Sequence, residues 1–495
     1  MTRPGPLPPD VPGLGLAGRH VTVAGLGVSG VPAARALAAL GARVTVVNAG
    51  DGDRDRAQAG ELEALGVTVR LGEGDTLPEG TDLVVTTPGW KPTSPLFRAA
   101  EAAGVPVWGD VELAWRLRAP DAPPWLAVTG TNGKTTTVRM LAAILTAAGL
   151  RTAAVGNIGV SLVESVLERA EDGGPAHDVL AVELSSYQLH WAPSLRVHSG
   201  AVLNLAPDHL DWHGSMDAYA ADKGRIYEGN QVACVYNAVD PADAATEKLV
   251  RAADVAEGCR AVGFTLGAPA PSQLGVVDGL LVDRAFVADR QRQAQELAET
   301  TDIAPGSGPA APHTIANALA AAALARAYGV PPTAVREGLL AFHPEAHRIQ
   351  LVAETGGVRW INDSKATNTH AAQASLAAYE SVVWIAGGLA KGATFDELVA
   401  ETAHRLRGVV LVGADRALIR EALARHAPQV PVVELERTDT GAMPEAVAEA
   451  ARLARPGDTV LLAPACASMD MYLNYTKRGE AFAEAVGDLV AAGRR

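Results

Sequence analysis

The chain has 495 residues and a formal net charge of −14, and 48% of its residues are hydrophobic and 20% charged. Its length favours two to four domains, and its negative charge argues against a nucleic-acid backbone as the main partner. No apolar run approaches the roughly 18 residues that span a bilayer, and three scattered cysteines (Cys234, Cys259, Cys466) support neither a disulfide framework nor a cysteine zinc site. We therefore expect a cytoplasmic protein, not inserted in a membrane, that acts on small molecules.

The first segment alternates strand-like and helix-like patterns. Residues 1–17 are proline-rich, lack the layout of a signal peptide and are predicted to be disordered. After them, the apolar spacing predicts a strand at 20–24, a helix at 31–40 and a second strand at 43–47. A later proline-rich stretch is typical of a linker, so the first domain is predicted to cover residues 1–113.

The same alternation continues along the rest of the chain. The middle segment starts with a predicted strand at 125–129, and two later strand-like runs end in polar residues. Residues 267–312 have weak periodicity, so we assign no element to them. The last segment holds five strand-like runs separated by helical patterns, which predicts a doubly wound sheet. The fold class is therefore α/β, with further domains expected at 114–344 and 345–495.

The segment "GTNGKTT" (130–136) lies between a predicted strand and a helical pattern. Gly130 and Gly133 allow backbone N–H groups to turn toward an anion, and the helix N-terminus adds positive potential. Lys134 is placed to reach the β- and γ-phosphates of ATP, and Thr135 to ligate Mg²⁺. The alternative is an ordinary glycine turn, but the Lys-Thr-Thr run favours a phosphate loop.

The segment "GLGVSG" (25–30) follows a predicted strand and opens a helix, as a dinucleotide-binding loop does. A nicotinamide site would have Asp or Glu at the end of the next strand, where this chain has Asn48. Three interpretations stay open: a nicotinamide dinucleotide, a different nucleotide that approaches pyrophosphate first, and a tight turn without a ligand.

Polar residues that end the middle strands are candidate contacts to metal or phosphate. Glu183 ends an apolar strand, where a carboxylate is costly unless it is paired or bound to a cation such as Mg²⁺. His209, Asp211 and His213 have a spacing similar to zinc ligation. Without a further well-placed ligand, we favour contacts of these residues to phosphate or to Mg²⁺-bound groups. Lys223 lies in a helical pattern that by itself indicates a solvated lysine.

Three polar clusters in the last segment follow predicted strands: "NDSKATN" (362–368), "GGLAKG" (387–392) and "PACAS" (464–468). Ligands of doubly wound sheets bind outside the carboxyl ends of the strands, so we expect these clusters to face one cleft. Lys365 and Lys391 would make that cleft basic, as an anionic co-substrate requires. The alternative for each cluster is an ordinary polar loop.

Together with "VGNIG", "ELSSYQL", "YAADKGRIY", "HTIANALAA" and "AHRIQ", these motifs occur in an order that resembles the Mur ligases. The resemblance covers the chain from about residue 18 onward, and "ELSSYQL", "NDSKATN" and "PACASMD" are most similar to the members that add D-glutamate. It implies an N-terminal Rossmann-like domain, a central P-loop ATPase-type domain and a C-terminal Rossmann-like domain.

The activity that the resemblance implies is ATP-dependent ligation of D-glutamate to UDP-N-acetylmuramoyl-L-alanine, through an acyl phosphate and a tetrahedral intermediate. Such a reaction belongs to peptidoglycan precursor synthesis, and through it to cell shape and cell division. The expected cofactor is Mg²⁺ or Mn²⁺, the expected partners are the small-molecule substrates alone, and the expected state is a monomer.

The resemblance also implies roles for individual residues. The UDP-sugar would be bound by Gly27, Val28, Ser29, Gly30, Asn48, Thr87, Asn157 and His209. ATP would be bound by Gly130, Thr131, Asn132, Gly133, Lys134, Thr135, Thr136, Asn317, Arg348 and Asp363. D-glutamate would be bound by Lys365, Thr367, Lys391, Ser468 and Tyr475. The metal would be held by Thr135, Glu183, His209 and a carbamylated Lys223, and the catalytic residues would be Lys134, Glu183, His209 and Lys223.

The rival functions differ in how each would use the phosphate loop "GTNGKTT". A sister Mur ligase, or an enzyme similar to folylpolyglutamate synthase, would add another amino acid with the same phosphate loop. An NAD(P)-dependent oxidoreductase built on residues 25–30 would give "GTNGKTT" no role. A nucleotide-dependent binding or switch protein would bind ATP without ligation.

Overall fold

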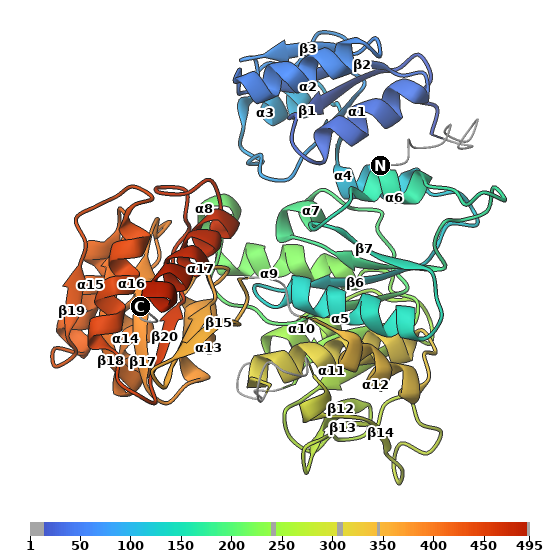
Figure 1. The fold of residues 1–495 in the computed structure, drawn as a ribbon. Coiled ribbons are helices and arrows are strands. Elements are labelled where there is room, and N and C mark those ends of the chain that lie inside the picture. The colour runs from blue at the N-terminus through green and yellow to red at the C-terminus, as the bar shows by residue number, and fades with distance from the viewer. Residues whose placement is uncertain (1–13, 239–243, 304–309, 344–346, 493–495) are drawn as a thin grey trace. The chain divides into compact units, whose positions relative to one another are not determined.

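The computed structural model describes residues 14–238, 244–303, 310–343 and 347–492. It is an α/β structure with three sheets, which Figure 1 labels along the chain. The chain divides into two compact units, one formed by Met1–Ile303 with Thr314–Phe342 and the other by Ala304–His313 with His343–Arg495. Among the described residues, no helix has the length and apolar character that crossing a bilayer requires.

The N-terminal sheet is fully parallel, with the strand order β3-β2-β1-β4-β5 of a Rossmann-like domain. Its strands are β1 (His20–Ala24), β2 (Arg43–Asn48), β3 (Thr68–Leu71), β4 (Leu83–Thr86) and β5 (Val107–Gly109), and its helices are α1 (Gly30–Ala39), α2 (Asp53–Glu63), α3 (Pro95–Ala102) and α4 (Asp110–Arg116). The strand predicted at 20–24 and the helix that follows it are confirmed. Residues 1–13 of the predicted disordered lead-in lie outside the described residues, whereas Leu16 is buried in the core.

The central sheet has nine strands in the order β14-β13-β12-β11-β10-β9-β6-β8-β7. Its strands are β6 (Trp125–Thr129), β7 (Thr152–Gly156), β8 (Val179–Glu183), β9 (Ser199–Val202), β10 (Ala233–Asn237), β11 (Arg260–Phe264), β12 (Gln273–Val277), β13 (Leu280–Asp283) and β14 (Gln295–Glu299). Its helices are α5 (Lys134–Ala147), α6 (Leu162–Leu167), α7 (Ser186–His190), α8 (Leu210–His213), α9 (Met216–Gly224), η1 (Arg225–Tyr227), α10 (Ala245–Ala252), η2 (Thr300–Asp302), α11 (Pro312–Ala327) and α12 (Pro332–Ala341).

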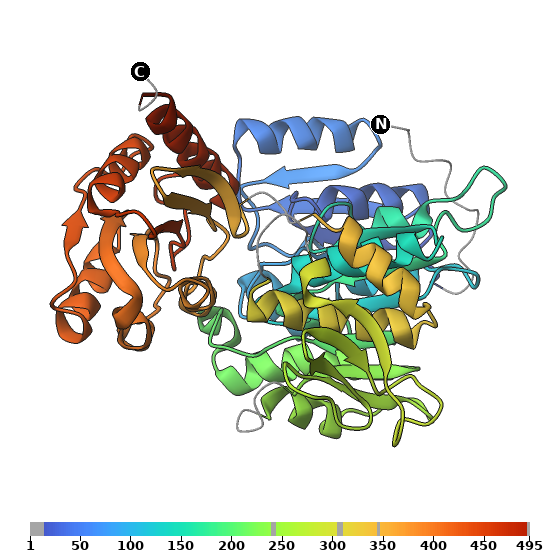
Figure 2. The same cartoon turned by 60° about the horizontal axis from the view of Figure 1, so that its bottom comes forward.

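Strands β6 to β12 of this sheet pair with one another in parallel, as the βα alternation predicts, but β13 and β14 are antiparallel. These last strands lie within residues 267–312, to which the sequence patterns assigned no element. The antiparallel ribbon lies at the lower end of the central domain in Figure 1 and comes forward in Figure 2.

The C-terminal sheet has the strand order β15-β16-β20-β17-β18-β19, in which only β15 pairs antiparallel. Its strands are β15 (Gln350–Thr355), β16 (Val358–Asn362), β17 (Val382–Gly387), β18 (Leu406–Val412), β19 (Val432–Glu434) and β20 (Thr459–Leu462). Its helices are α13 (Thr369–Ala377), α14 (Asp396–Thr402), η3 (Ala403–Arg405), α15 (Arg416–His426), α16 (Ala442–Leu453) and α17 (Tyr475–Ala492). The predicted doubly wound arrangement is therefore present, with one antiparallel strand at its edge.

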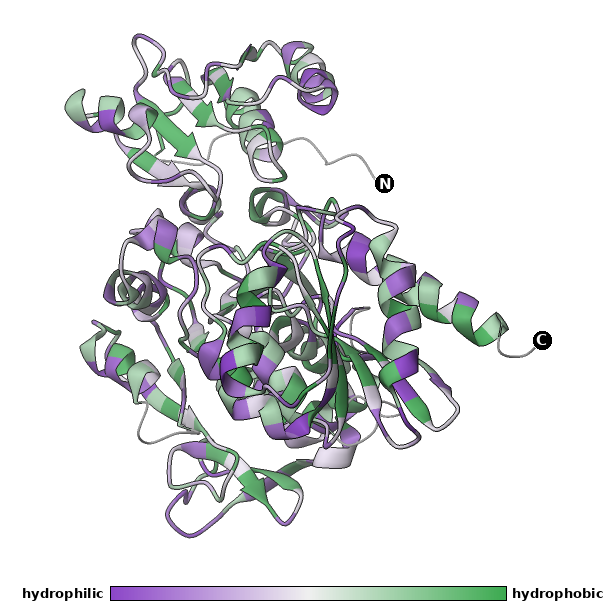
Figure 3. Cartoon of the chain, turned by 90° about the vertical axis from the view of Figure 1, so that its left-hand side faces the viewer, coloured by the Kyte–Doolittle hydropathy of each residue, from purple (hydrophilic) through white to green (hydrophobic). Residues whose placement is uncertain are grey.

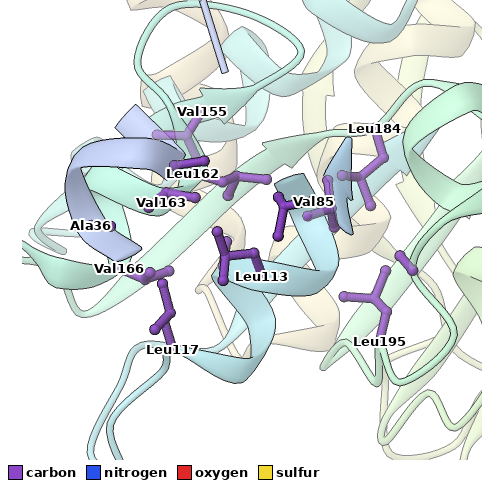
Figure 4. Close-up of a cluster of buried hydrophobic side chains, with 14 of the residues drawn as sticks. Ala36, Val85, Leu113, Leu117, Val155, Leu162, Val163, Val166, Leu184 and Leu195 are labelled. Atoms are coloured by element: carbon purple, nitrogen blue, oxygen red, sulfur yellow. The ribbon is translucent and has the colours of Figure 1, made fainter. Parts of the chain in front are cut away.

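Burial of the apolar strands explains why these sheets form. In Figure 3 the strands are mainly green, the colour of apolar residues, while purple polar residues lie mostly on helices and loops. Within the first unit, one core cluster joins the N-terminal and central domains. Figure 4 shows Ala36 of α1, Leu113 of α4 and Val163 of α6 in this cluster. The boundary predicted at residue 113 thus falls inside a packed helix, and the one predicted at 344 lies outside the described residues.

Candidate active site

The phosphate loop joins β6 to α5 and is held by residues distant in the sequence. Gly133 has φ 84°, and a Cβ at this position would lie 2.4 Å from Oδ1 of Asn317 on α11. Asn204, which follows β9, accepts a hydrogen bond from the Asn132 N–H (2.8 Å) and donates one to the Asn132 carbonyl (3.1 Å). Glycine is therefore required at residue 133, and the fold brings the predicted ATP residue Asn317 against the loop.

Two lysines converge on this loop. Lys134 Nζ donates to the carbonyls of Gly130 and Thr131, at 2.9 Å each. Lys223 Nζ, on α9, donates to the same Gly130 carbonyl at 2.8 Å, and Lys223 is only 2% exposed. Burial, with the nearby charge of Lys134, lowers the pKa of Lys223 well below its usual value. The indication of a solvated Lys223 from its helical pattern alone is therefore wrong, because α9 packs its lysine beneath the loop.

Glu183 supplies a buried carboxylate beside the same loop. It is 2% exposed; Oε1 accepts a hydrogen bond from Asn157 Nδ2 at 3.0 Å, while Oε2 has no hydrogen-bond partner among the described residues. An unpaired carboxylate oxygen in this position is unfavourable unless a cation binds it. Thr135 is buried and lies in the first turn of helix α5, which begins at Lys134. A carboxylate and a hydroxyl group are oxygen ligands of the kind that Mg²⁺ prefers, so this set fits the implied cation.

The structure gives His209, Asp211 and His213 different partners. His209 has φ 53° and precedes α8, with its ring 4.9 Å from the ring of Tyr187. Asp211 pairs with Lys91 at 3.2 Å. His213 is held between Asp222 (Nδ1 to Oδ2, 3.0 Å) and a serine hydroxyl. The spacing similar to zinc ligation therefore does not form a zinc site, and within the described residues no three His, Cys, Asp or Glu side chains group to hold a metal.

Asp222 supports α9 next to Lys223 and was missed by sequence reasoning. His190 and His213 both hydrogen-bond to its carboxylate, at 2.9 and 3.0 Å. Burial alone would raise the pKa of Asp222, but these hydrogen bonds lower it to about 2. The other ring nitrogen of His213 lies 3.0 Å from Ser186 Oγ, which gives the order of a Ser-His-Asp triad. The His213 side chain and Ser186 are buried, and both ring nitrogens of His213 are engaged in these contacts.

Polar side chains hold the backbone around the first glycine loop (25–30), and this loop contains no lysine. Asn48 Oδ1 accepts a hydrogen bond from the Leu26 N–H at 3.2 Å, and the Thr87 hydroxyl donates to the Ala24 carbonyl at 2.9 Å. Val28, at the tip of the loop, is 69% exposed. Asn48 therefore holds the loop backbone at the position where a nicotinamide site would have an acid.

Helix α4 connects this loop to the central domain through a buried acid that sequence reasoning missed. Asp110 accepts hydrogen bonds from the hydroxyl group of Ser29 and from Gln188 Nε2, the latter at 3.2 Å. Burial raises the pKa of Asp110. Gln188 in turn accepts a hydrogen bond from the Ser185 N–H at 3.0 Å, two residues beyond Glu183. A chain of hydrogen bonds thus runs from the predicted UDP-sugar loop to the segment that follows the buried carboxylate.

The second unit brings the three predicted C-terminal clusters to one sheet edge. They follow β16, β20 and β17, which are parallel neighbours. Leu389 and Ala467 exchange backbone hydrogen bonds of 2.9 Å, and the Ala465 N–H donates to Ala366. Lys365 Nζ donates to the hydroxyl group of Tyr475 at 2.9 Å.

The remaining predicted D-glutamate residues lie on the same loops. Thr367 is half-buried and Ser468 is buried, whereas Lys391 is exposed with φ 51°. The structure therefore places all five predicted residues at the edge where the carboxyl ends of these strands meet.

Arg478 of α17 fastens two of these loops together and was also missed by sequence reasoning. It is 2% exposed, and its guanidinium donates to Ser364 Oγ (3.0 Å), to the Ser364 carbonyl (2.8 Å) and to the Cys466 carbonyl (3.1 Å). Burial lowers the pKa of Arg478 to about 10. Since its bonds join segments more than 100 residues apart in the sequence, spacing gave no signal for this role.

The predicted nucleotide residues are divided between the two units. Asn317 belongs to the first unit, and Arg348 and Asp363 to the second. Asp363 accepts a hydrogen bond from the Ile349 N–H at 3.3 Å and another from the Ser375 hydroxyl group. Burial raises the pKa of Asp363, and the Ser375 hydrogen bond and the charge of Arg348 oppose that shift.

Comparison with known proteins decides the family. The Mur ligase middle domain matches residues 128–325, and the glutamate ligase domain of Mur ligases matches residues 347–466. A UDP-N-acetylmuramoylalanine–D-glutamate ligase of Streptomyces avermitilis is 77% identical over 96% of this chain and 99% of its own length. The corresponding protein of Streptomyces coelicolor is 76% identical over the same shares. The chain belongs to the Mur ligase family.

Solved structures agree with this family at the level of the fold. A UDP-N-acetylmuramate–alanine ligase of Thermotoga maritima matches with a TM-score of 0.55 and 18% identity, over 95% of this Mur ligase and 99% of that chain. The predicted resemblance to the Mur ligases and the α/β fold are confirmed. The roles assigned to individual residues stay predictions.

Proposed function

We propose that this Mur ligase joins D-glutamate to UDP-N-acetylmuramoyl-L-alanine and converts ATP to ADP and phosphate. The observation that carries this proposal is the 77% identity, over nearly the whole of both chains, to a relative named for D-glutamate ligation. The phosphate loop with Lys134 supports the ATP dependence, because an oxidoreductase would give this loop no role. The proposed product is a precursor of peptidoglycan.

The residues of the phosphate loop would bind and orient the triphosphate. The Lys134 ammonium, now on two backbone carbonyls, lies where the helix N-terminus of α5 also favours negative charge. When ATP binds, we expect Lys134 to exchange these carbonyls for the β- and γ-phosphate oxygens. Its charge then counters the charge that develops on the transferring group.

Glu183, Thr135, His209 and Lys223 are the residues that would hold Mg²⁺ or Mn²⁺, and the cation would neutralise charge on the triphosphate. Lys223 would take part as a carbamate. The Lys223 amine is buried, and its pKa is lowered well below the usual value. In the carbamylation step the uncharged amine would attack CO₂; a N–C bond would form, a proton would be released and a carboxylate would result. This modification would turn the buried amine next to the loop into an oxygen ligand.

The proposed chemistry has two steps. A carboxylate oxygen of the L-alanine residue attacks the γ-phosphorus of ATP, which gives an acyl phosphate and ADP. The amine of D-glutamate then attacks the acyl carbon, and the tetrahedral intermediate expels phosphate to leave the amide. Lys365, Lys391 and Ser468 would orient D-glutamate by its carboxylates, so the contribution of the protein is mainly positioning.

A phosphate-release assay over a panel of amino acids tests the function. With UDP-N-acetylmuramoyl-L-alanine and Mg-ATP present, we expect turnover with D-glutamate and not with L-glutamate, L-alanine, L-lysine or meso-diaminopimelate. Turnover with a different amino acid would favour a sister ligase, and turnover with a folate acceptor a folylpolyglutamate-type enzyme. Phosphate release that needs no amino acid would indicate an ATPase switch. The monomeric state and the cytoplasmic location stay predictions.

A further inference from the structure

Two cysteines of the central sheet lie in contact. Cys234 is the second residue of β10 and Cys259 immediately precedes β11, and their Sγ atoms are 3.9 Å apart. In the parallel pairing of β10 with β11, Cys234 is opposite Ala261. Cys259 lies just outside β11 and two residues before Ala261, so the two sulfurs meet diagonally at the end of this strand pair.

The two thiols differ in access and in acidity. Cys234 is 2% exposed, whereas Cys259 is half-buried. A hydrogen bond between the sulfurs lowers the pKa of Cys259, while that contact and burial raise the pKa of Cys234. The thiolate is the nucleophilic form of cysteine. Cys259 is thus the sulfur that an oxidant in solution meets first, with a second thiol directly behind it.

We propose that Cys234 and Cys259 are a modification site, at which a hydroperoxide converts the two thiols to a reversible disulfide. The Cys259 thiolate attacks one peroxide oxygen; the O–O bond breaks, hydroxide leaves and a sulfenic acid forms. Cys234 sulfur then attacks the Cys259 sulfur, the S–S bond forms, and the sulfenic oxygen leaves as water with the thiol proton. With hydrogen peroxide, two thiols and one peroxide give one disulfide and two water molecules.

Disulfide formation requires the two sulfurs to come closer. A disulfide has a sulfur separation of about 2.05 Å, so the sulfurs at 3.9 Å must approach by about 1.9 Å. No described group of three His, Cys, Asp or Glu residues offers metal binding as an alternative use of this pair. The chemistry that two adjacent thiols retain is oxidation to a disulfide.

The disulfide would brace the central sheet without blocking the phosphate loop. It closes a loop of 25 residues between β10 and β11, and closure of a loop restricts the unfolded chain. In the sheet register Cys234 is level with Ala127, which precedes the phosphate loop and lies two strands away. We therefore expect the oxidised protein to resist heat better and to keep its ligation activity.

The experiment titrates the reduced full-length protein with hydrogen peroxide, blocks free thiols by alkylation and identifies peptides by mass spectrometry. We expect a Cys234–Cys259 cross-linked peptide that a dithiol reverses, while buried Cys466 remains alkylated. In Cys234→Ser the second thiol is absent, so dimedone should trap a sulfenic acid at Cys259. Cys259→Ser should give neither product. The thermal midpoint should rise by at least about 3 °C on oxidation of the wild type, and in neither variant.

Two results would overturn the proposed modification site, and a third would overturn the expected bracing of the sheet. The first is folded wild-type protein in which both cysteines remain alkylated after peroxide. The second is Cys259 that passes to sulfinic acid without a cross-link. The third is a cross-link that leaves the midpoint unchanged, which would remove the bracing role. None of these measurements uses a ligation substrate, so they stand apart from the test of the proposed function.

Discussion

Two strand–turn–helix units, β1 to α1 and β6 to α5, both have turns that contain glycines. The two turns differ in the charged side chains around them. The second turn carries Lys134, whose ammonium contacts two backbone carbonyls of the turn. The first turn (25–30) contains no lysine, and the hydroxyl group of its Ser29 donates a hydrogen bond to the buried carboxylate of Asp110. Glycine placement therefore specifies how the backbone turns, while the surrounding charges specify what the turn can bind.

The difference matches the ligands that we propose for the two turns. A triphosphate that transfers its terminal group develops charge that cations must counter, as the second turn allows. A diphosphate that only anchors a substrate is sufficiently held by backbone N–H groups and a helix N-terminus. On this proposal the first turn anchors the substrate and the second takes part in catalysis, and the following variants test that division.

Lys134→Ala should have the largest effect. Removal of the ammonium leaves the transferring phosphate without its protein cation, and we expect kcat to fall by about 10²-fold or more. Circular dichroism and the thermal midpoint should be unchanged. Lys248→Ala, on the exposed face of α10, is the matched control and should keep full activity. Full turnover by Lys134→Ala would refute the assignment of the phosphate loop.

Glu183→Gln should come next, because it keeps the shape of the side chain and removes its charge. We expect activity to fall by roughly 10- to 100-fold and the Mg²⁺ concentration for half-maximal rate to rise. A titration of activity with Mg²⁺ measures both effects. An unchanged Mg²⁺ dependence would mean that Glu183 Oε2, the oxygen without a hydrogen-bond partner among the described residues, does not face the cation.

The first turn offers a pair of glycines with opposite expectations. A Cβ at Gly30 would lie 1.9 Å from the Gly25 carbonyl oxygen, whereas a Cβ at Gly27 meets open space. Gly30→Ala should destabilise the protein by about 1–3 kcal/mol. Gly27→Ala should leave the free energy of unfolding unchanged and raise the KM for the UDP-linked acceptor several-fold. Equal stability losses in both variants would show that Gly27 has a structural role instead.

Asp110→Asn should have the smallest effect of the four on activity. It weakens the hold on Ser29, so we expect the KM for the UDP-linked acceptor to rise a few-fold while the KM for ATP stays constant. Glu112→Gln on the same helix is the control, because Glu112 contacts Ser194 and not the loop. It should lower stability without this change in KM. A rise in both KM values for Asp110→Asn would argue for a general disturbance of the domain.

Local sequence signals were sufficient for most of the fold and insufficient for one part of it. The alternation of apolar runs and helical patterns predicted strands such as β1 and β6. The prediction succeeded because a fully buried strand that precedes a helix has a continuous apolar run in the sequence. The hairpin of β12 and β13 was missed, although its turn at Asp278 and Gly279 is a strong hairpin signal. The surrounding Ala, Pro and Gln residues weaken the hydrophobic periodicity of residues 267–312 as a whole, and this weak periodicity masks the short hairpin within them.

The site divides in the same way between local and long-range information. The phosphate loop is one continuous motif, and the fold brings Gly130, Gly133 and Lys134 into one turn as the motif predicts. Asp110 and Arg478 bond to residues 78 and 114 positions away, so no spacing rule detects them. The burial of Lys223 was likewise unpredictable, because it depends on how the fold places α9 next to the turn that follows β6.

Helix α4 has a consequence for attempts to recombine related enzymes. Asp110 and Glu112 are buried on partners that follow β8, and the Gly109 N–H also donates to the Trp191 carbonyl at 2.9 Å. In a hybrid whose central domain lacks Gln188 or Ser194, these buried carboxylates would lose their hydrogen-bond donors. For such a pair of relatives, we expect a functional chimera only when the segment around residues 185–194 is transplanted along with the first domain.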